Sequence, residues 1–325
     1  MLALGIFAVT RIVSCATSDH VEAGKTVTLT IPEGASGDAI VNKLMDKHVI
    51  DDAKAYYAAV KEQDAESKLQ PGSYRLKTLM DPADVVKQLV KGPNNGGKLV
   101  IPEGLTVNQV AERVKKAYGI STDDFLSQAK ASLYADRFSF LKGVGNDSLE
   151  GFLFPKTYTF SSSKVTADDV VSAMLKQYQK EYASLDFASA ESSIASRYGV
   201  QLNDYQMLIL ASIVEREAVT DAQRYKVSST FFNRLKADMP LQSDAVMGYV
   251  TGGAVTADDL KKESPYNTYL NKGLPPTPIC SPSLKSIKAT LAPADTDYLY
   301  FFITNDSEYF SQTYDQHLQA IEENR

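Results

Sequence analysis

Residues 205–217 read Tyr-Gln-Met-Leu-Ile-Leu-Ala-Ser-Ile-Val-Glu-Arg-Glu, an apolar run that ends in two carboxylates. Asn203 and Asp204, just before the run, carry side-chain oxygens that can cap the start of a helix. Apolar residues at three- and four-residue spacings form one side of this helix, and isoleucines fill the other side. The pattern predicts a helix that is buried nearly all round, around which the rest of the chain is organised.

Glu215 lies within the last turn of this predicted helix, where the chain leaves the core. Partial burial disfavours a charged carboxylate, which is the condition that a general acid needs near neutral pH. The alternative is that Glu215 and Glu217 only mark where a core helix reaches water, because most charged residues are exposed. The run alone leaves both interpretations open.

Composition limits the chemistry that this chain can perform. With 325 residues, 44% of them hydrophobic, it can build two or three domains with substantial cores. Its net charge of -6 argues against a nucleic-acid partner, because nucleic-acid binding depends on Lys and Arg contacts with phosphates. Cys15 and Cys280 lack metal-site spacing, and the three histidines are scattered. We therefore expect no metal or other cofactor, and chemistry based on carboxylates, hydroxyls and amides.

The first 16 residues are apolar, but Arg11 interrupts them and they are shorter than the roughly 20 residues of a membrane span. Three interpretations are open: a signal sequence, the end of a membrane anchor whose beginning is missing, or an apolar element of a soluble protein. The segment Ile12–Cys15 also resembles a lipoprotein cleavage box, although no basic residues precede the apolar run. We favour an export or anchor segment.

A strand, turn and helix pattern occurs twice in the following part of the chain. Residues 27–34 and 98–104 each read as a strand ending in Pro-Glu-Gly, and a helical apolar pattern follows each of them. Glu33 and Glu103 are interpreted as turn or capping residues. Residues 92–97, which are rich in Gly and Asn, are predicted to form a flexible joint between the copies.

Aromatic residues alternate after Glu150, at positions 152, 154, 158 and 160. This alternation predicts a strand with one aromatic face. The face belongs either to the core or to a saccharide-binding surface that Glu150 begins.

Polar residues gather downstream in loops. Residues 239–245 are predicted to form a loop in which Gln242 and Asp244 reach a cleft, and residues 264–282 form further ordered loops. Arg224 and Arg234, on the predicted helix between, are candidates to orient Glu217 or a substrate carboxylate.

Several segments together resemble the YceG-like family of endolytic murein transglycosylases, the MltG proteins. They are Glu150-Gly-Phe-Leu-Phe-Pro155, Leu210-Ala-Ser-Ile-Val-Glu-Arg-Glu-Ala218, Phe232-Asn-Arg-Leu235, Leu241-Gln-Ser-Asp244, Tyr266-Asn-Thr-Tyr269, Gly273-Leu-Pro-Pro276 and Ser283-Leu-Lys285. The resemblance covers about residues 25–325. It departs from the family pattern at Ser243-Asp-Ala-Val-Met247, where Pro-Thr-Val is common after the Asp, and at Thr277, where Gly is frequent.

The resemblance implies an α+β fold, in which a small LysM-like strand-helix domain precedes a mixed α+β YceG-like catalytic domain. The predicted division is an anchor remnant and linker over residues 1–24, a LysM-like binding subdomain over 25–97, a second strand-helix unit and connection over 98–148, and the catalytic domain over 149–325.

The resemblance places the family's catalytic glutamate on Glu215. The motif residues expected to line or support the cleft are Glu150, Glu217, Gln242, Asp244, Asn267 and Tyr269. The implied reaction cleaves the β-1,4 bond between N-acetylmuramic acid and N-acetylglucosamine in peptidoglycan and leaves a 1,6-anhydro end. One acid suffices, because the C6 hydroxyl of the substrate replaces water, whereas ordinary glycoside hydrolysis uses two carboxylates.

Two other functions stay open. The first is a hydrolysing muramidase with Asp244 as its second carboxylate, and the second is a non-catalytic scaffold for cell-wall binding or division. The expected partners are peptidoglycan glycan strands, a membrane reached through the amino-terminal segment, and the machinery of cell-wall synthesis or division. We expect an extracytoplasmic catalytic part with a single anchor in the cell membrane.

Overall fold

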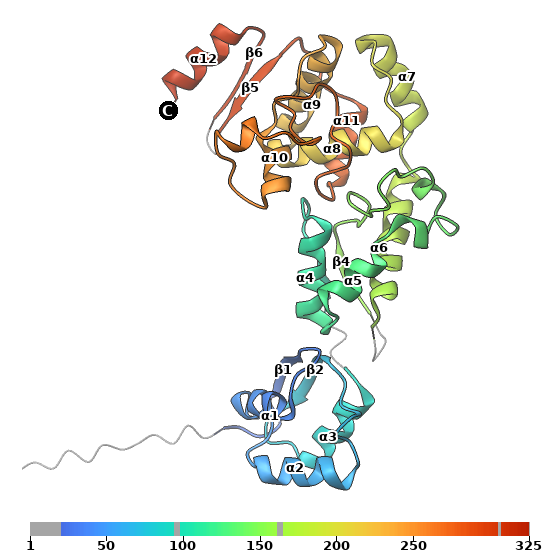
Figure 1. The fold of residues 1–325 in the computed structure, drawn as a ribbon, viewed down its shortest axis with the longest axis vertical. Helices are drawn as coiled ribbons and strands as arrows, with labels where there is room; N and C mark the ends of the chain where they lie inside the picture. Colours follow the sequence, from blue (N-terminus) through green and yellow to red (C-terminus); the bar gives the residue numbers. More distant parts are fainter. Residues whose placement is uncertain (1–20, 94–97, 161–164, 305–306, 325) are drawn as a thin grey trace, which may run out of the picture.

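The computed structural model describes residues 21–93, 98–160, 165–304 and 307–324. Three units follow one another along the longest axis, from the blue amino-terminal unit through the green middle unit to the yellow and red carboxy-terminal unit (Figure 1). The predicted anchor segment lies outside the described residues, as does most of the predicted joint. None of the described helices combines the length and the apolar character needed to cross a membrane.

The amino-terminal unit packs three helices against a two-stranded sheet. Strands β1 and β2 are antiparallel, with Thr26 opposite Lys77 and Ile31 opposite Gly72. Leu44, Val85 and Leu89 have no exposed surface, so the apolar faces of the helices meet in one core. The elements are β1 (Thr26–Ile31), α1 (Gly37–Asp46), α2 (Ala53–Glu62), β2 (Gly72–Lys77) and α3 (Pro82–Lys91).

The middle unit repeats the strand, Pro-Glu-Gly turn and helix of the first, as predicted. Its strand β3 pairs antiparallel with β4, and a capping box between Thr106 and Gln109 starts the following helix. The elements are β3 (Lys98–Val100), α4 (Val107–Tyr118), α5 (Thr122–Gln128), the 3-10 turns η1 (Ala131–Leu133) and η2 (Ser139–Leu141), β4 (Thr157–Thr159) and α6 (Ala167–Tyr182).

One hydrophobic cluster joins this whole unit, from Leu99 to Tyr178. It therefore crosses the predicted boundary between residues 148 and 149, and Leu208 of the carboxy-terminal unit also packs into it. The predicted division of the chain into domains stays a prediction. What the structure shows is a set of separate hydrophobic clusters.

The predicted aromatic strand after Glu150 is wrong. Only Thr157–Thr159 pair as a strand, because Gly151, with a φ of +87°, turns the chain just after Glu150. Phe152 is 2% exposed and lies in an aromatic stack with Tyr178 and Tyr205. The rings of Phe152, Phe154 and Tyr158 thus belong to the core, and Phe160 packs against it.

The carboxy-terminal unit is built around the helix predicted from the apolar run. Asn203 caps this helix through a capping box with Gln206, and the residues from Met207 to Val214 are at most 3% exposed. Helices α9, α10 and α11 pack on it. The elements are α7 (Phe187–Tyr198), α8 (Asp204–Glu217), α9 (Asp221–Lys236), α10 (Asp244–Thr251), the 3-10 turn η3 (Asp259–Lys261), α11 (Leu284–Leu291), β5 (Tyr300–Ile303), β6 (Glu308–Ser311) and α12 (Tyr314–Glu323).

Gly151 should tolerate no side chain. A Cβ there would lie 2.7 Å from Pro278 Cβ and 3.2 Å from Leu208 Cδ2, whereas a Cβ at Gly143, which has the same φ of +87°, meets nothing within 4 Å. We expect Gly151→Ala to lower the free energy of unfolding by about 1–3 kcal/mol more than Gly143→Ala, because only the former adds overpacking to backbone strain. Urea unfolding of both variants measures the difference, and equal losses would contradict the packing argument.

Candidate active site

Two hollows share Glu217 and Asp244 as lining residues, one within the carboxy-terminal unit and one between that unit and the middle unit. The first has a volume of about 500 Å³ and extends over Gln242 and Tyr269 toward β5 and α12. The second, of about 780 Å³, extends from Arg216 toward α10 and the first turn of α4. Glu217 therefore stands where the two hollows meet.

Glu217 is the last residue of α8 and accepts a hydrogen bond of 2.5 Å from the hydroxyl of Ser243. Burial raises the pKa of this carboxyl above its usual range, and the nearby Asp244 raises it further. The Ser243 hydroxyl and the backbone N–H of Ala245 lower the pKa without cancelling the effect of burial. A proton is thus held more tightly on Glu217 than on a solvated glutamate.

Glu215 has a different environment. Its Oε2 accepts hydrogen bonds from the backbone N–H of Ser283 at 3.0 Å, from the Ser283 hydroxyl at 2.6 Å and from the Ser286 hydroxyl at 2.6 Å. Its Oε1 lies 3.5 Å from Nη2 of Arg224. These donors hold the Glu215 carboxylate in place, and the side chain is only 7% exposed.

The catalytic role of Glu215 stays a prediction, and the structure places other residues along the two hollows. Glu215 lines neither hollow, and none of its hydrogen bonds or ion pairs within the described residues joins it to Gln242, Asn267 or Tyr269. Its carboxylate instead joins α8 to α9 and to the amino-terminal end of α11, where Ser283 is the N-cap. Arg224, predicted to orient Glu217 or a substrate, is occupied by Glu215.

Gln242, Asp244 and Tyr269 do line the first hollow together with Glu217, as predicted. The Tyr269 hydroxyl donates to Oδ1 of Asp244 at 2.6 Å. Gln242 has a φ of +52°, in the left-handed region that is uncommon for residues other than glycine. Its carboxamide oxygen accepts from Nη1 of Arg234 at 3.1 Å, so its amide N–H groups remain available to a ligand.

Arg234 organises this corner of the cleft more than the sequence indicated. Its guanidinium donates to the backbone carbonyls of Pro240, Leu241 and Leu299 as well as to Gln242. Arginine suits this arrangement because its planar guanidinium presents donors on three nitrogens in a fixed fork, whereas the three N–H donors of lysine sit on one nitrogen. Arg234 thus holds the Gln242 side chain, while the Gln242 backbone N–H donates to the Thr268 carbonyl at 2.9 Å.

Asn267 does not reach the cleft. It has no exposed surface, and its amide donates to the carbonyls of Leu260 and Lys262 while its oxygen accepts from the N–H of Tyr269. Its role is to shape the loop that presents Tyr269. The predicted loop over residues 239–245 also differs, because Asp244 already begins α10.

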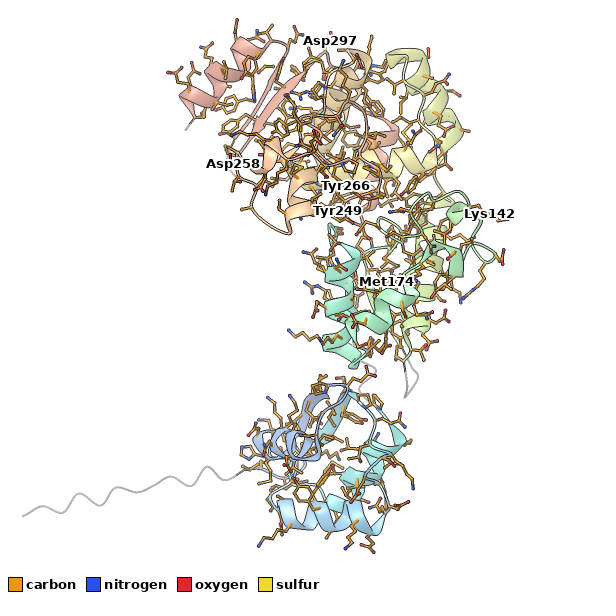
Figure 2. All side chains as sticks on the ribbon, viewed as in Figure 1. Lys142, Met174, Tyr249, Asp258, Tyr266 and Asp297 are labelled. Carbon is orange, nitrogen blue, oxygen red and sulfur yellow. The ribbon has the colours of Figure 1, made fainter. Side chains whose placement is uncertain are left out.

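Glu150 is a second buried carboxyl, placed behind the cleft. Only 4% of it is exposed, and burial raises its pKa to about 7. Both oxygens accept from the backbone N–H of Val107 at 3.2 Å, and the hydroxyl of Tyr249 donates to it at 3.2 Å. Figure 2 shows Tyr249 and Tyr266 on the side of the carboxy-terminal unit that faces the middle unit. Glu150 therefore ties α4 to α10.

Within the described part of the chain, no group of three or more His, Cys, Asp or Glu side chains is placed to hold a metal ion. Cys280 is buried and carries a free thiol.

Comparison with known proteins identifies the family. Residues 29–323 match the YceG-like family. The chain belongs to this family. A crystal structure of a yceG-like protein from Listeria monocytogenes is 32% identical, with a TM-score of 0.62, over 91% of this chain and 98% of that protein. The resemblance and the mixed α+β architecture predicted from it are thus confirmed.

Two curated relatives of this YceG-like chain carry the name endolytic murein transglycosylase. The protein from Bacillus subtilis (strain 168) is 34% identical over 91% of this chain and 84% of its own length. The protein from Streptococcus pneumoniae (strain ATCC BAA-255 / R6) is 30% identical over 92% of this chain, which spans 58% of that longer protein.

Glu150 should make folding stability depend on pH. Its pKa is higher in the folded state than in the unfolded chain, so the folded protein retains a proton that the unfolded chain loses above about pH 4.5. The stabilising contribution of Glu150 to the free energy of unfolding is therefore fully present below that pH. It is lost as pH rises through about 7, and the total loss is roughly 3 kcal/mol. Urea unfolding of the wild type and of Glu150→Gln between pH 4 and 8 measures it. As pH rises, the free energy of unfolding of Glu150→Gln should increase relative to that of the wild type. A pH-independent difference between the two proteins would contradict the raised pKa of Glu150.

Proposed function

We propose that this YceG-like chain is an endolytic lytic transglycosylase that cleaves the β-1,4 bond between N-acetylmuramic acid and N-acetylglucosamine in peptidoglycan. Glu217 acts as the single general acid and base. The observation that carries the proposal is the place of Glu217, a desolvated carboxyl with a raised pKa where two hollows meet. The names of the bacillar and streptococcal relatives support the substrate and the reaction.

In the first step, protonated Glu217 gives its proton to the glycosidic oxygen and the bond to the anomeric carbon breaks. The N-acetylglucosamine part leaves as an alcohol, and positive charge develops on the muramyl ring. The resulting Glu217 carboxylate then removes the proton of the C6 hydroxyl, whose oxygen closes the 1,6-anhydro ring. Glu217 ends the cycle protonated and no water is consumed, so the step balances with one carboxyl group.

The neighbours of Glu217 position the substrate and provide polar contacts to it. The free amide N–H groups of Gln242 and the phenol of Tyr269 line the same hollow and can hold the sugar against the acid. Because Arg234 and the backbone fix Gln242, these donors require little rearrangement when the substrate binds.

The hollows on both sides of Glu217 support cleavage within a strand. A glycan can continue past the acid in both directions, toward α12 through the first hollow and toward α4 through the second. An enzyme that only trims chain ends needs a cleft on one side alone. The geometry thus supports the endolytic mode.

A hydrolysing muramidase is the second candidate, because Asp244 lines both hollows beside Glu217. In that reaction Asp244 would activate water or attack the anomeric carbon. Its carboxylate already accepts from Tyr269, which favours a positioning role. Product mass separates the two, since an anhydro end is one water lighter than a reducing end.

The amino-terminal unit has its own core and sheet, which supports a separate LysM-like module that binds the glycan strand. Since peptidoglycan lies outside the cytoplasm, we propose that the described units are extracytoplasmic and that the apolar start of the sequence serves their export or membrane anchoring. Contacts with the machinery of cell-wall synthesis or division would follow from this location.

The two carboxylates at the end of α8 should respond differently to substitution. Glu217→Gln should reduce release of anhydro-muropeptides by about 10²- to 10⁴-fold, because the amide cannot give a proton. Glu215→Gln should retain activity within about tenfold of the wild type and lower the free energy of unfolding by about 1–3 kcal/mol, through its lost charge-assisted bonds. Mass spectrometry of digested sacculi and urea unfolding measure both. Full activity in Glu217→Gln, or a folded but inactive Glu215→Gln, would return the role of acid to Glu215.

Ser243 should tune the pH range of activity. Catalysis needs Glu217 protonated first, so kcat/KM falls on the alkaline side as this group ionises. The Ser243 hydroxyl lowers the pKa of Glu217, so Ser243→Ala should move the alkaline limb to higher pH. A pH profile of anhydro-product release from soluble glycan strands measures the shift, and movement to lower pH would be inconsistent with this role.

A further inference from the structure

The second hollow is built from two units of the chain. One wall comes from the first turn of α4, where Thr106, Asn108 and Gln109 line it, and the opposite wall comes from Arg216 and α10. Backbone hydrogen bonds hold the walls together: Gly104 N–H donates to the Ser281 carbonyl at 2.9 Å, and Ser281 N–H donates to the Leu105 carbonyl at 2.8 Å. The second Pro-Glu-Gly copy is therefore part of the cleft.

Arg216 is a cation beside this hollow, and its charge acts on the neighbouring Glu217. It stands between Glu215 and Glu217 on α8 and is exposed, and its Cδ and Nη1 lie 3.8 Å from the position of a Cβ added to Gly104. Its guanidinium makes no hydrogen bond or ion pair with any residue that the structure describes, although Asp244 lines the same hollow. Glu215 is engaged by Arg224 and two serines, which leaves Arg216 available.

The opposite wall also offers free donors. Within the described residues, the carboxamide of Asn108 has no hydrogen-bond partner. Gln109 uses its oxygen to accept from Thr106 N–H at 3.0 Å, and its amide N–H groups bond to no residue that the structure describes. A guanidinium facing two amides is a set of donors, and a planar carboxylate is the acceptor that an arginine fork binds best.

We propose that Arg216, with Asn108 and Gln109, binds a carboxylate carried by the lactyl arm of the N-acetylmuramic acid residue that occupies the second hollow. This inference rests on the proposed function, and it identifies the substrate group that the second hollow recognises. The carboxylate is either the free lactyl group of a strand without peptides or a carboxylate of the attached peptide stem. In both cases Arg216 determines which strands are cleaved.

The charges around the hollow permit such an anion. Burial raises the pKa of Glu217, which favours its neutral form and weakens its repulsion of a bound anion. The Asp244 carboxylate accepts a hydrogen bond from the Tyr269 hydroxyl, which directs it toward Tyr269. Since Arg216 directly precedes Glu217, binding the arm places the adjoining glycosidic bond near the acid. The loss of Arg216 should therefore raise KM more than it lowers kcat.

The test compares three soluble substrates: glycan strands with peptide stems, strands stripped of stems by an amidase, and stripped strands whose lactyl carboxylates have been converted to neutral amides. Initial rates of anhydro-end formation give kcat and KM for the wild type, Arg216→Ala and Arg216→Lys. Arg113→Ala is the matched control, because Arg113 is exposed on α4 and lines neither hollow. Thermal unfolding verifies that each variant is folded.

We expect Arg216→Ala to raise KM about 10- to 100-fold on at least one carboxylate-bearing substrate. Arg216→Lys should be intermediate, Arg113→Ala should resemble the wild type, and wild type and Arg216→Ala should converge on the neutral strands. A loss confined to stem-bearing strands identifies a peptide carboxylate, and a loss on stripped strands identifies the lactyl group. An unchanged KM on both charged substrates, or an equal loss on the neutral strands, overturns the inference. A wild type that forms no anhydro ends from any substrate overturns the proposed function instead.

Discussion

The carboxylate of Glu215 joins three helices of the carboxy-terminal unit, and the cleft is built on that junction. It accepts from the N-cap serine of α11 and faces Arg224 of α9, so the end of α8 cannot rotate. Apolar burial of the preceding turns fixes the other end of the helix. Packing and charge-assisted hydrogen bonds thus fix the conformation of the end of α8. Glu217, two residues after Glu215, is held in its position at the cleft by this segment.

The two carboxylates illustrate how environment assigns a role. Glu215 accepts hydrogen bonds from Ser283 and Ser286, which make it a structural anchor. Glu217 is desolvated, receives fewer donors and has Asp244 nearby, which favours its protonated form. A spacing of two residues on a helix points their side chains in different directions, so neighbours in the sequence can have opposite properties.

The middle unit shares in the site through two contacts. Glu150 accepts from the first N–H of α4 and from Tyr249 of α10, and the Gly104 turn pairs with Ser281. These contacts place the first turn of α4 at the edge of the second hollow. The repeated strand-helix pattern therefore has two different outcomes: its first copy belongs to a separate core, and its second copy forms part of the cleft wall.

The sequence by itself determined the local elements whose causes are local. The capped helix at the apolar run, the two Pro-Glu-Gly turns and the helix begun by Pro82 depend on periodicity, capping and fixed backbone angles, which neighbouring residues supply. It also indicated Gln242, Asp244 and Tyr269 as residues of one cleft, through their family motifs. Only the tertiary structure decided that the aromatic residues near Glu150 are core, that Asn267 is buried, and that Glu217 rather than Glu215 faces the hollows. The reason is physical: the environment of each carboxyl depends on groups distant in the sequence. Ser283 is 68 residues from Glu215 and Ser243 is 26 residues from Glu217, and a single helix pattern contains no information about them.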